Sequence, residues 1–160
     1  MSRLWMQWKA MELMIRTYSE LVKIDSFIDR FKYLELNGKV GYETFGYNRY
    51  LNQVLYKSEE WREFRRKVLI RDSCCEMGLK GYDIDKEDYP TIHHINPITV
   101  EDARDRRKCV FDFNNVVTVS SKLHKGIHYG SRQIMQAILS SYEPVERRKY
   151  DTCPWKINRF

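Results

Sequence analysis

The four histidines of this 160-residue chain all fall between His93 and His128, and they constrain its fold more than any other feature. They form an adjacent pair, His93 and His94, and a second pair, His124 and His128, spaced by four positions. Imidazole is a common ligand of divalent metals, and its unperturbed pKa suits proton transfer near neutral pH. If the four rings meet in space, three of them can hold a metal ion while the fourth handles a proton.

The first pair lies in a segment that favours an extended conformation. The β-branched Thr91 and Ile92 favour a strand, and Pro97 stops it. Neighbouring residues of a strand point to opposite faces, so His93 and His94 cannot both bind one ion from an ideal strand. We therefore expect the two histidines to have different roles.

The second pair lies in a segment that favours a short helix. A serine at 120–121 can cap this helix, and Gly130 can end it. On such a helix His124 and His128 lie one turn apart on the same face, which is the spacing of two histidines that chelate a metal.

Between the two pairs, the residues predict a turn and a second strand. Asn114 and Asn115 favour the turn, and the β-branched run at 116–119 favours the strand. The predicted order is a strand with two histidines, a long loop, an asparagine turn, a strand and a helix with two histidines.

This order resembles the ββα-metal motif of the HNH nuclease superfamily. The first letter of the motif falls on His93 and His94, the middle letter on Asn115 and the last on His124. The additional His128 makes the last element similar to that of the colicin-type HNH nucleases. The resemblance implies an α+β fold, in which a two-stranded antiparallel hairpin and a short helix form the core, with an N-terminal helical arm and flanking helices.

The chain also resembles a group of small HNH proteins encoded by tailed bacteriophages, from roughly residue 34 to residue 155. The shared stretches are 44–46, 49–53, 60–61, 92–99, 125–130 and 151–155. One departure concerns zinc, because many HNH proteins hold a structural zinc with two Cys-x-x-Cys pairs. Here only Cys74 and Cys75 precede the motif, and serines occupy the later region. We expect no structural zinc of that kind, and we expect reduced cysteines.

For hydrolysis of a DNA phosphodiester, we assign His93, His124 and His128 as ligands of one divalent ion and His94 as the general base. Asn115 does not exchange protons at physiological pH, so we expect its amide to bridge backbone groups and to hold the loop that aims His94. Nitrogen ligands favour zinc, nickel or manganese, while the resemblance allows magnesium. It also implies products with 5′-phosphate and 3′-hydroxyl ends.

Each of these residues also has a simpler interpretation. A buried histidine with a satisfied hydrogen bond is an ordinary core residue. His128 can be a cation that interacts with the end of its helix rather than a ligand. Asn115 can be a turn former, since Asn114 beside it is equally suited to a turn.

The net charge of +6 and the isoelectric point of about 9.1 permit a polyanionic partner without requiring one. Basic side chains gather in two short segments and in the histidine helix, where they can bind DNA phosphates. The candidates are Arg62, Arg65, Arg66, Arg104, Arg106, Arg107, Lys108 and Lys125. For each of them the alternative is an ordinary solvated surface charge.

Capping residues predict two further helices. Ser58, followed by two glutamates, predicts a helix start. The buried face of this helix is expected to carry Trp61, Phe64, Val68 and Leu69. Asp25 or Ser26 predicts the start of a short helix that extends through Phe31.

The N-terminal segment predicts an amphipathic helix over 4–24, because apolar residues recur there at steps of three and four. The apolar stripe consists of Leu4, Trp8, Met11, Ile15, Tyr18 and Val22. This stripe either packs on its own domain or docks on a partner. We divide the chain into a helical arm (1–55), a nuclease core (56–132) and a C-terminal helix with an extended tail (133–160).

The resulting hypothesis is a metal-dependent HNH-type DNA endonuclease of a bacteriophage, acting in the cytoplasm of the bacterial host. The sequence contains no long apolar run and no secretory signal, so we expect no membrane partner. One alternative is a genome-packaging accessory whose N-terminal stripe docks on the phage terminase or portal, as the phage resemblance implies. Another is a zinc-stabilised DNA-binding module without catalysis.

Overall fold

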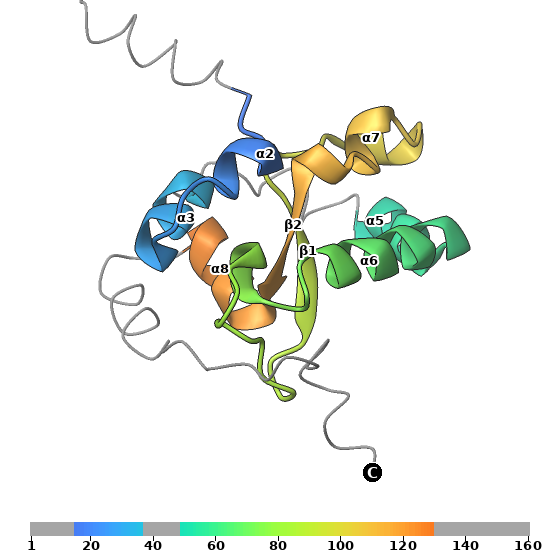
Figure 1. Cartoon of the computed structure of the whole chain (residues 1–160). Helices are drawn as coiled ribbons and strands as arrows, with labels where there is room; N and C mark the ends of the chain where they lie inside the picture. Colours follow the sequence, from blue (N-terminus) through green and yellow to red (C-terminus); the bar gives the residue numbers. More distant parts are fainter. Residues whose placement is uncertain (1–14, 37–48, 130–160) are drawn as a thin grey trace, which may run out of the picture.

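An antiparallel hairpin lies at the centre of the structure, a computed structural model that describes residues 15–36 and 49–129 (Figure 1). Strand β1 (Pro90–His94) pairs with strand β2 (Val116–Ser120). The register sets His93 against Val117 and His94 against Val116. The expected α+β class is confirmed at this level, as a two-stranded hairpin with helices.

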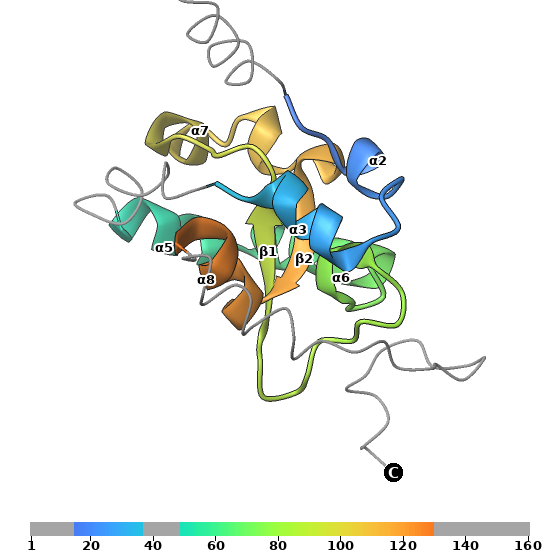
Figure 2. The same ribbon diagram turned by 90° about the vertical axis from the view of Figure 1, so that its left-hand side faces the viewer.

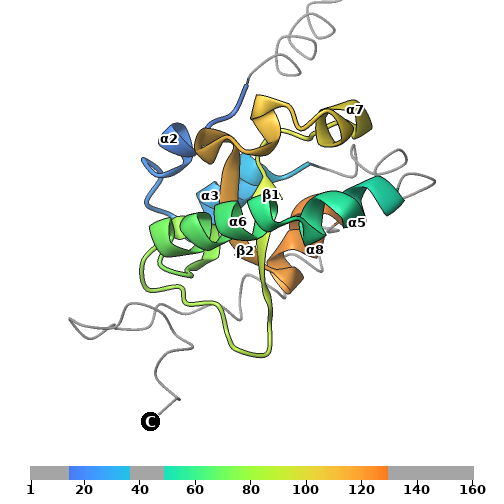
Figure 3. The ribbon, with the colours of Figure 1, turned by 90° about the vertical axis from the view of Figure 1, so that its right-hand side faces the viewer.

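Helices cover both faces of this hairpin. Figure 2 looks onto the face with α3 (Phe27–Leu34) and α8 (Ser121–Tyr129), near α2 (Tyr18–Leu21). Figure 3 looks onto the opposite face, with α5 (Arg49–Lys57) and α6 (Glu59–Arg71). Each face therefore has its own apolar layer.

The two apolar layers follow from the alternation of the strands. Val117 and Val119 point into the layer that contains Leu123 and Ile127 of α8 together with residues of α2 and α3. Val116 points the other way, into the layer formed with α5 and α6. Burying each such side chain contributes roughly 1.5–3 kcal/mol, so both layers fix the hairpin between the helices.

The serine caps are confirmed. The Ser26 hydroxyl accepts a hydrogen bond from the Asp29 amide at the start of α3, and the Ser58 hydroxyl accepts one from the Trp61 amide at the start of α6. The predicted inner face of α6 is buried as well. Ser120 caps α8 by accepting a hydrogen bond from the Leu123 amide at 3.0 Å.

The N-terminal segment departs from the predicted helix over 4–24. Thr17 is extended, with φ of −132° and ψ of 153°, and it caps a helix of only four residues, α2. The Arg16 and Thr17 amides donate to the side chains of Asn96 and Tyr33, so tertiary partners replace the helical hydrogen bonds. Ile15 is 78% exposed. The stripe residues before it, and the predicted helix and tail at 133–160, lie outside the described residues.

The outer edge of β2 is closed by buried carboxylates. Asp72 accepts a hydrogen bond from the Thr118 amide at 2.8 Å, and Glu76 accepts one from the Ser120 amide at 2.9 Å. Arg71 pairs with Asp72 and donates to the Val116 carbonyl. Charged partners make these hydrogen bonds strong, and they occupy an edge that would otherwise be open to another strand.

The connection between the strands is a series of short helical turns. It contains α7 (Val100–Arg104), η2 (Lys108–Val110) and η3 (Phe113–Asn115). The Asp112 side chain caps the η3 turn, and the second strand begins at Val116, as the turn at Asn114 and Asn115 and the β-branched run after it predict. Across 15–36 and 49–129, no helix combines the length and the apolar character that a membrane crossing requires.

Candidate functional site

Three of the four histidines surround a common point on the α8 face of the hairpin. The ring centroid of His93 lies 5.3 Å from that of His124 and 5.2 Å from that of His128. The two α8 rings are 4.5 Å apart. One ring nitrogen from each residue lies within 4.8 Å of the others, so the three could hold a metal ion. The structure thus brings together the three predicted ligands.

Local structure explains this convergence. His93 occupies the strand position whose side chain faces α8, and it is 1% exposed. His124 and His128 follow each other by one turn of α8, while Leu123 and Ile127, which are buried, fix that helix on the hairpin. The geometry of this candidate metal site therefore comes from two regular elements, β1 and α8, rather than from a loop.

The ring nitrogens of His93 are the polar atoms that best test whether a metal fits. Both are buried, and neither has a hydrogen-bond partner among the described residues. A buried polar group left without a partner costs about 1–3 kcal/mol, and such groups are uncommon. A cation held between the three rings would engage one of these nitrogens, so the donor set fits a metal.

The electrostatics of the cluster favour neutral rings. Burial lowers the pKa of His93 well below its usual value, and the neighbouring rings of His124 and His128 lower it further. Burial also lowers the pKa of His128, and together with adjacent histidines it lowers the pKa of His124 to about 4. Neutral imidazole is the form that binds metals. A role for His128 as a helix-end cation would require the charged form, which this burial disfavours.

His94 lies on the opposite face of the same strand. Its ring stacks on Trp61, with centroids 5.7 Å apart and planes inclined by 29°. Its Nε2 donates a hydrogen bond to the Val110 carbonyl at 3.0 Å. This bond places the ring proton on Nε2 and leaves the lone pair on Nδ1 to accept a proton. Burial lowers the pKa of His94, and the bond to Val110 partly offsets that change.

Asn115 ties the end of β1 to the loop that holds His94. Its Oδ1 accepts hydrogen bonds from the backbone amide of Asn96 at 3.0 Å and from the side-chain amide at 2.7 Å. Its Nδ2 donates to the carbonyl of Cys109 at 3.0 Å. Cys109 directly precedes Val110, whose carbonyl accepts from His94. The side chain of Asn115 therefore makes backbone bridges of the kind expected from the sequence.

The neighbouring Asn114 has a different set of contacts. Its Oδ1 accepts hydrogen bonds from the backbone amide and the hydroxyl of Ser19, at 2.9 and 2.7 Å, on the exposed side of the structure. Although both asparagines lie in η3, Asn115 is buried and Asn114 is exposed. The two residues are equally suited to a turn, but Asn115 contacts the loop around His94.

Sequence reasoning missed the positioning role of Asn96 and Arg16. The side-chain amide of Asn96 donates to the Arg16 carbonyl at 2.7 Å, and its Oδ1 accepts from the Arg16 amide at 3.0 Å. Asn96 thereby connects Asn115 to the segment that precedes α2. The sequence signal was a polar residue at the end of an apolar strand, just before Pro97. The contact of Trp61 with His94 had no local signal, since the two lie far apart in the chain.

The predicted DNA-binding cations lie in varied surroundings. Four arginines have acidic partners: Arg66 with Glu63, Arg104 with Asp105, Arg106 with Glu60, and Arg107 with Asp102 and Asp105. Arg62 and Arg65 donate instead to the backbone carbonyls of Lys57 and Pro90. Lys108 and Lys125 are exposed. Exposed ion pairs contribute only about 0–1 kcal/mol, so a phosphate can compete with such carboxylates.

The described cysteines lie outside the histidine cluster. Cys74, Cys75 and Cys109 are free thiols, the first two buried and the third partly exposed. Cys75 contacts Asp83 through its sulfur, at 3.5 Å. The group that could hold a metal within the described part of the chain consists of histidines alone.

Comparison with protein-family models, with curated proteins and with solved structures finds no match for this chain. The interpretation of the site therefore depends on its own geometry and chemistry.

Proposed function

We propose that this chain is a metal-dependent DNA endonuclease of the ββα-metal, or HNH, type, encoded by a bacteriophage. The observation that carries the proposal is the separation of the two histidines of β1. His93 joins His124 and His128 in a cluster that could hold a metal, while His94 lies on the other face with a ring nitrogen able to accept a proton.

Hydrolysis of a phosphodiester needs a nucleophile made from water, neutralisation of the charge that develops on the phosphate, and stabilisation of the departing oxygen. A divalent ion bound by His93, His124 and His128 would supply the last two by polarising the phosphate and binding the 3′ oxygen. The protein must then supply the base that activates the water.

In this proposal His94 is that base. Its Nδ1 takes a proton from water as the new oxygen–phosphorus bond forms and the bond from phosphorus to the 3′ oxygen breaks. The departing oxygen takes a proton from solvent, which leaves 5′-phosphate and 3′-hydroxyl ends. The Val110 carbonyl, which accepts from Nε2, stabilises the positive ring that forms. Trp61 holds the plane of the ring from one side.

Asn115 acts through the backbone and exchanges no proton. Its hydrogen bonds fix the Cys109 carbonyl and the Asn96 amide relative to each other. This arrangement holds the loop whose Val110 carbonyl orients the ring of His94. Groups that orient a reacting residue in this way commonly change activity by about 10–100-fold when removed from metal sites.

The choice of ion follows from the donor atoms. Imidazole suits zinc, nickel and other transition metals, whereas magnesium prefers oxygen ligands. With three neutral nitrogen donors, we expect zinc or nickel to bind more tightly than manganese, and manganese more tightly than magnesium.

Cleavage of supercoiled plasmid across zinc, nickel, manganese and magnesium tests the proposal. The wild-type protein should cut with at least one of these ions, and His94→Ala should bind the same ion and DNA without cutting. Asn114→Ala, which alters an exposed neighbour in η3, serves as the control for general damage to the loop. Equal cutting by His94→Ala and wild type would remove the assigned base. Tightly held zinc without cleavage under any ion would instead indicate a non-catalytic DNA-binding module.

A further inference from the structure

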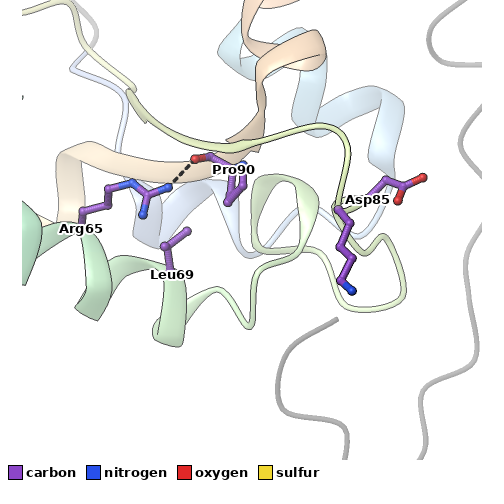
Figure 4. A pocket seen from close by; sticks show the side chains of 5 residues that line it. Arg65, Leu69, Asp85 and Pro90 are labelled. Carbon is purple, nitrogen blue, oxygen red and sulfur yellow. Dashed lines mark hydrogen bonds between the residues drawn. The ribbon is translucent and has the colours of Figure 1, made fainter. Parts of the chain in front are cut away.

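A pocket of about 280 Å³ lies at the beginning of β1, away from the histidine cluster (Figure 4). It is lined by Arg65, Leu69, Asp85, Lys86 and Pro90. Two of these five side chains are cationic and one is acidic. The pocket therefore carries a net positive charge.

Arg65 differs from most of the other arginines proposed to bind DNA, because it has no acidic partner within residues 15–36 and 49–129. It is partly buried and donates to the Pro90 carbonyl at 2.7 Å, its one hydrogen bond within the described residues. The next residue on α6, Arg66, is exposed and donates to both carboxylate oxygens of Glu63. A guanidinium has five N–H donors, and a cation partly removed from water without a counterion is incompletely compensated.

The geometry of the pocket favours an anion beside Arg65. Figure 4 shows the guanidinium of Arg65 directed at Pro90, while the carboxylate of Asp85 points away from it. Lys86 adds an exposed ammonium group to the lining. A planar guanidinium with unused donors matches two oxygens of a phosphate, and a lysine adds a mobile point charge.

The position of the pocket relates it to the histidines. Along α6, Trp61 stacks on His94, and Arg65, one turn later, contacts Pro90 at the other end of β1. At about 3.3 Å per residue, Pro90 and His94 are separated by roughly 13 Å along the strand. A backbone that carries one phosphate per nucleotide can therefore reach the pocket and the histidines with different phosphates of the same molecule.

We propose that Arg65 and Lys86 form a subsite for one backbone phosphate of DNA, distinct from the phosphate cut at the histidines. The inference rests on the proposed function in that the ligand is DNA, but it concerns binding alone and assigns no part of the reaction to the pocket.

The test measures binding of a fluorescent duplex of about two helical turns by anisotropy, in EDTA, over a series of salt concentrations. Each lost phosphate contact reduces the slope of log K against log [salt] by about 0.9. Arg65→Gln and Lys86→Gln should both weaken binding and flatten this slope. The matched control is Lys67→Gln, which removes one charge from the exposed side of α6, where Lys67 pairs with Glu63. Its slope should stay close to that of the wild type.

Arg65 also contacts the backbone of β1, so its variant could lose binding through misfolding. Lys86→Gln guards against this, because Lys86 is exposed, and the thermal unfolding midpoint of each variant checks the fold. A slope unchanged in both pocket variants, or changed equally in Lys67→Gln, would overturn the subsite. The subsite would also be overturned if Arg65→Gln changed the binding of inorganic phosphate to the protein but left the binding of DNA unchanged.

Because no metal is present, the result is independent of cleavage. If the plasmid assay finds no nuclease activity but Arg65→Gln flattens the slope, the subsite stands and the proposed reaction fails. If plasmid is cut but the slope is unchanged, the reaction stands and the subsite fails. A wild-type protein that binds no DNA in EDTA overturns the subsite, and the plasmid assay alone then decides the proposed reaction.

Discussion

His93 and His94 are neighbours on one strand, yet their surroundings have little in common. His93 is enclosed by two other imidazoles, and its ring nitrogens have no hydrogen-bond partner among the described residues. His94 stacks on an indole and donates a hydrogen bond to a carbonyl. The alternation of side chains along a strand produces this difference, because each face meets a different helix. The two histidines thereby have different environments, and substitutions can separate the two roles that we propose for them.

The largest effect is expected when His93 is replaced. His93→Ala leaves only two of the three proposed ligands, both on α8. Removing a residue that merely hydrogen-bonds to a metal ligand typically lowers metal affinity by roughly 10–100-fold. Loss of a ligand itself should lower the affinity for zinc or nickel, measured by calorimetry, by more than that. Cleavage should be lost at the same time. His94→Ala is the control on the other face, since it removes an imidazole but no ligand. Undiminished metal affinity in His93→Ala would show that the ion binds elsewhere.

Replacing His94 should lower the rate of cleavage without changing the affinity for the metal. His94→Ala removes the group that deprotonates water, and general base catalysis contributes about 10²–10⁴-fold to a rate. Single-turnover cleavage at saturating metal should fall by that factor, while calorimetry gives an affinity close to that of the wild type. A parallel loss of metal affinity would mean that the two faces are not independent.

The local parts of this arrangement were predictable from sequence. Three features depend only on residues that are close together in the chain, and the structure shows all of them. They are the alternating side-chain directions at 91–94, the spacing of four between His124 and His128, and the serine caps at Ser26 and Ser58. Two of these local patterns, together with the resemblance to the HNH nucleases, predicted the candidate metal site formed by His93, His124 and His128.

The partners of His94 were not predictable in this way. Trp61 contacts His94 because α6 packs on β1. Val110 contacts it because of the path of the connection between β1 and β2, whose sequence has no repeating pattern that predicts this path. The error at the N-terminus has a similar cause. The periodicity of the apolar stripe favours a helix, but Asn96, from another part of the chain, binds the backbone of Arg16 and holds it out of that helix.

The neutral histidine cluster should make the metal-free protein sensitive to acid. Between pH 6.5 and about 5, the unfolded chain takes up protons on histidines whose pKa is about 6.5, whereas burial keeps the folded rings neutral. Unfolding then binds protons, so stability falls as pH falls. The urea midpoint in EDTA should decrease across this range, and His124→Ala should lessen the decrease. A midpoint that rises on acidification would contradict neutral, buried rings.

The smallest expected effect concerns Asn115 and tests how His94 is held. Asn115→Ala leaves the Asn96 amide and the Cys109 carbonyl without their partner, which should lower the free energy of unfolding by about 1–3 kcal/mol. It should also reduce single-turnover cleavage by about 10–100-fold, because the loop next to Val110 is released. Urea denaturation and cleavage by the folded fraction measure the two effects separately.

Asn96→Ala sharpens this test, because it removes the side-chain contacts to Asn115 and Arg16 but keeps the hydrogen bond from Asn115 to the Cys109 carbonyl. If that bond positions His94, Asn96→Ala should lose stability with a smaller loss of rate than Asn115→Ala. Asn114→Ala, which loses only exposed contacts to Ser19, should keep the wild-type rate. If Asn115→Ala lowers stability but its folded fraction cuts at the wild-type rate, then Asn115 only forms the turn, and His94 is held by its own contacts with Trp61 and Val110.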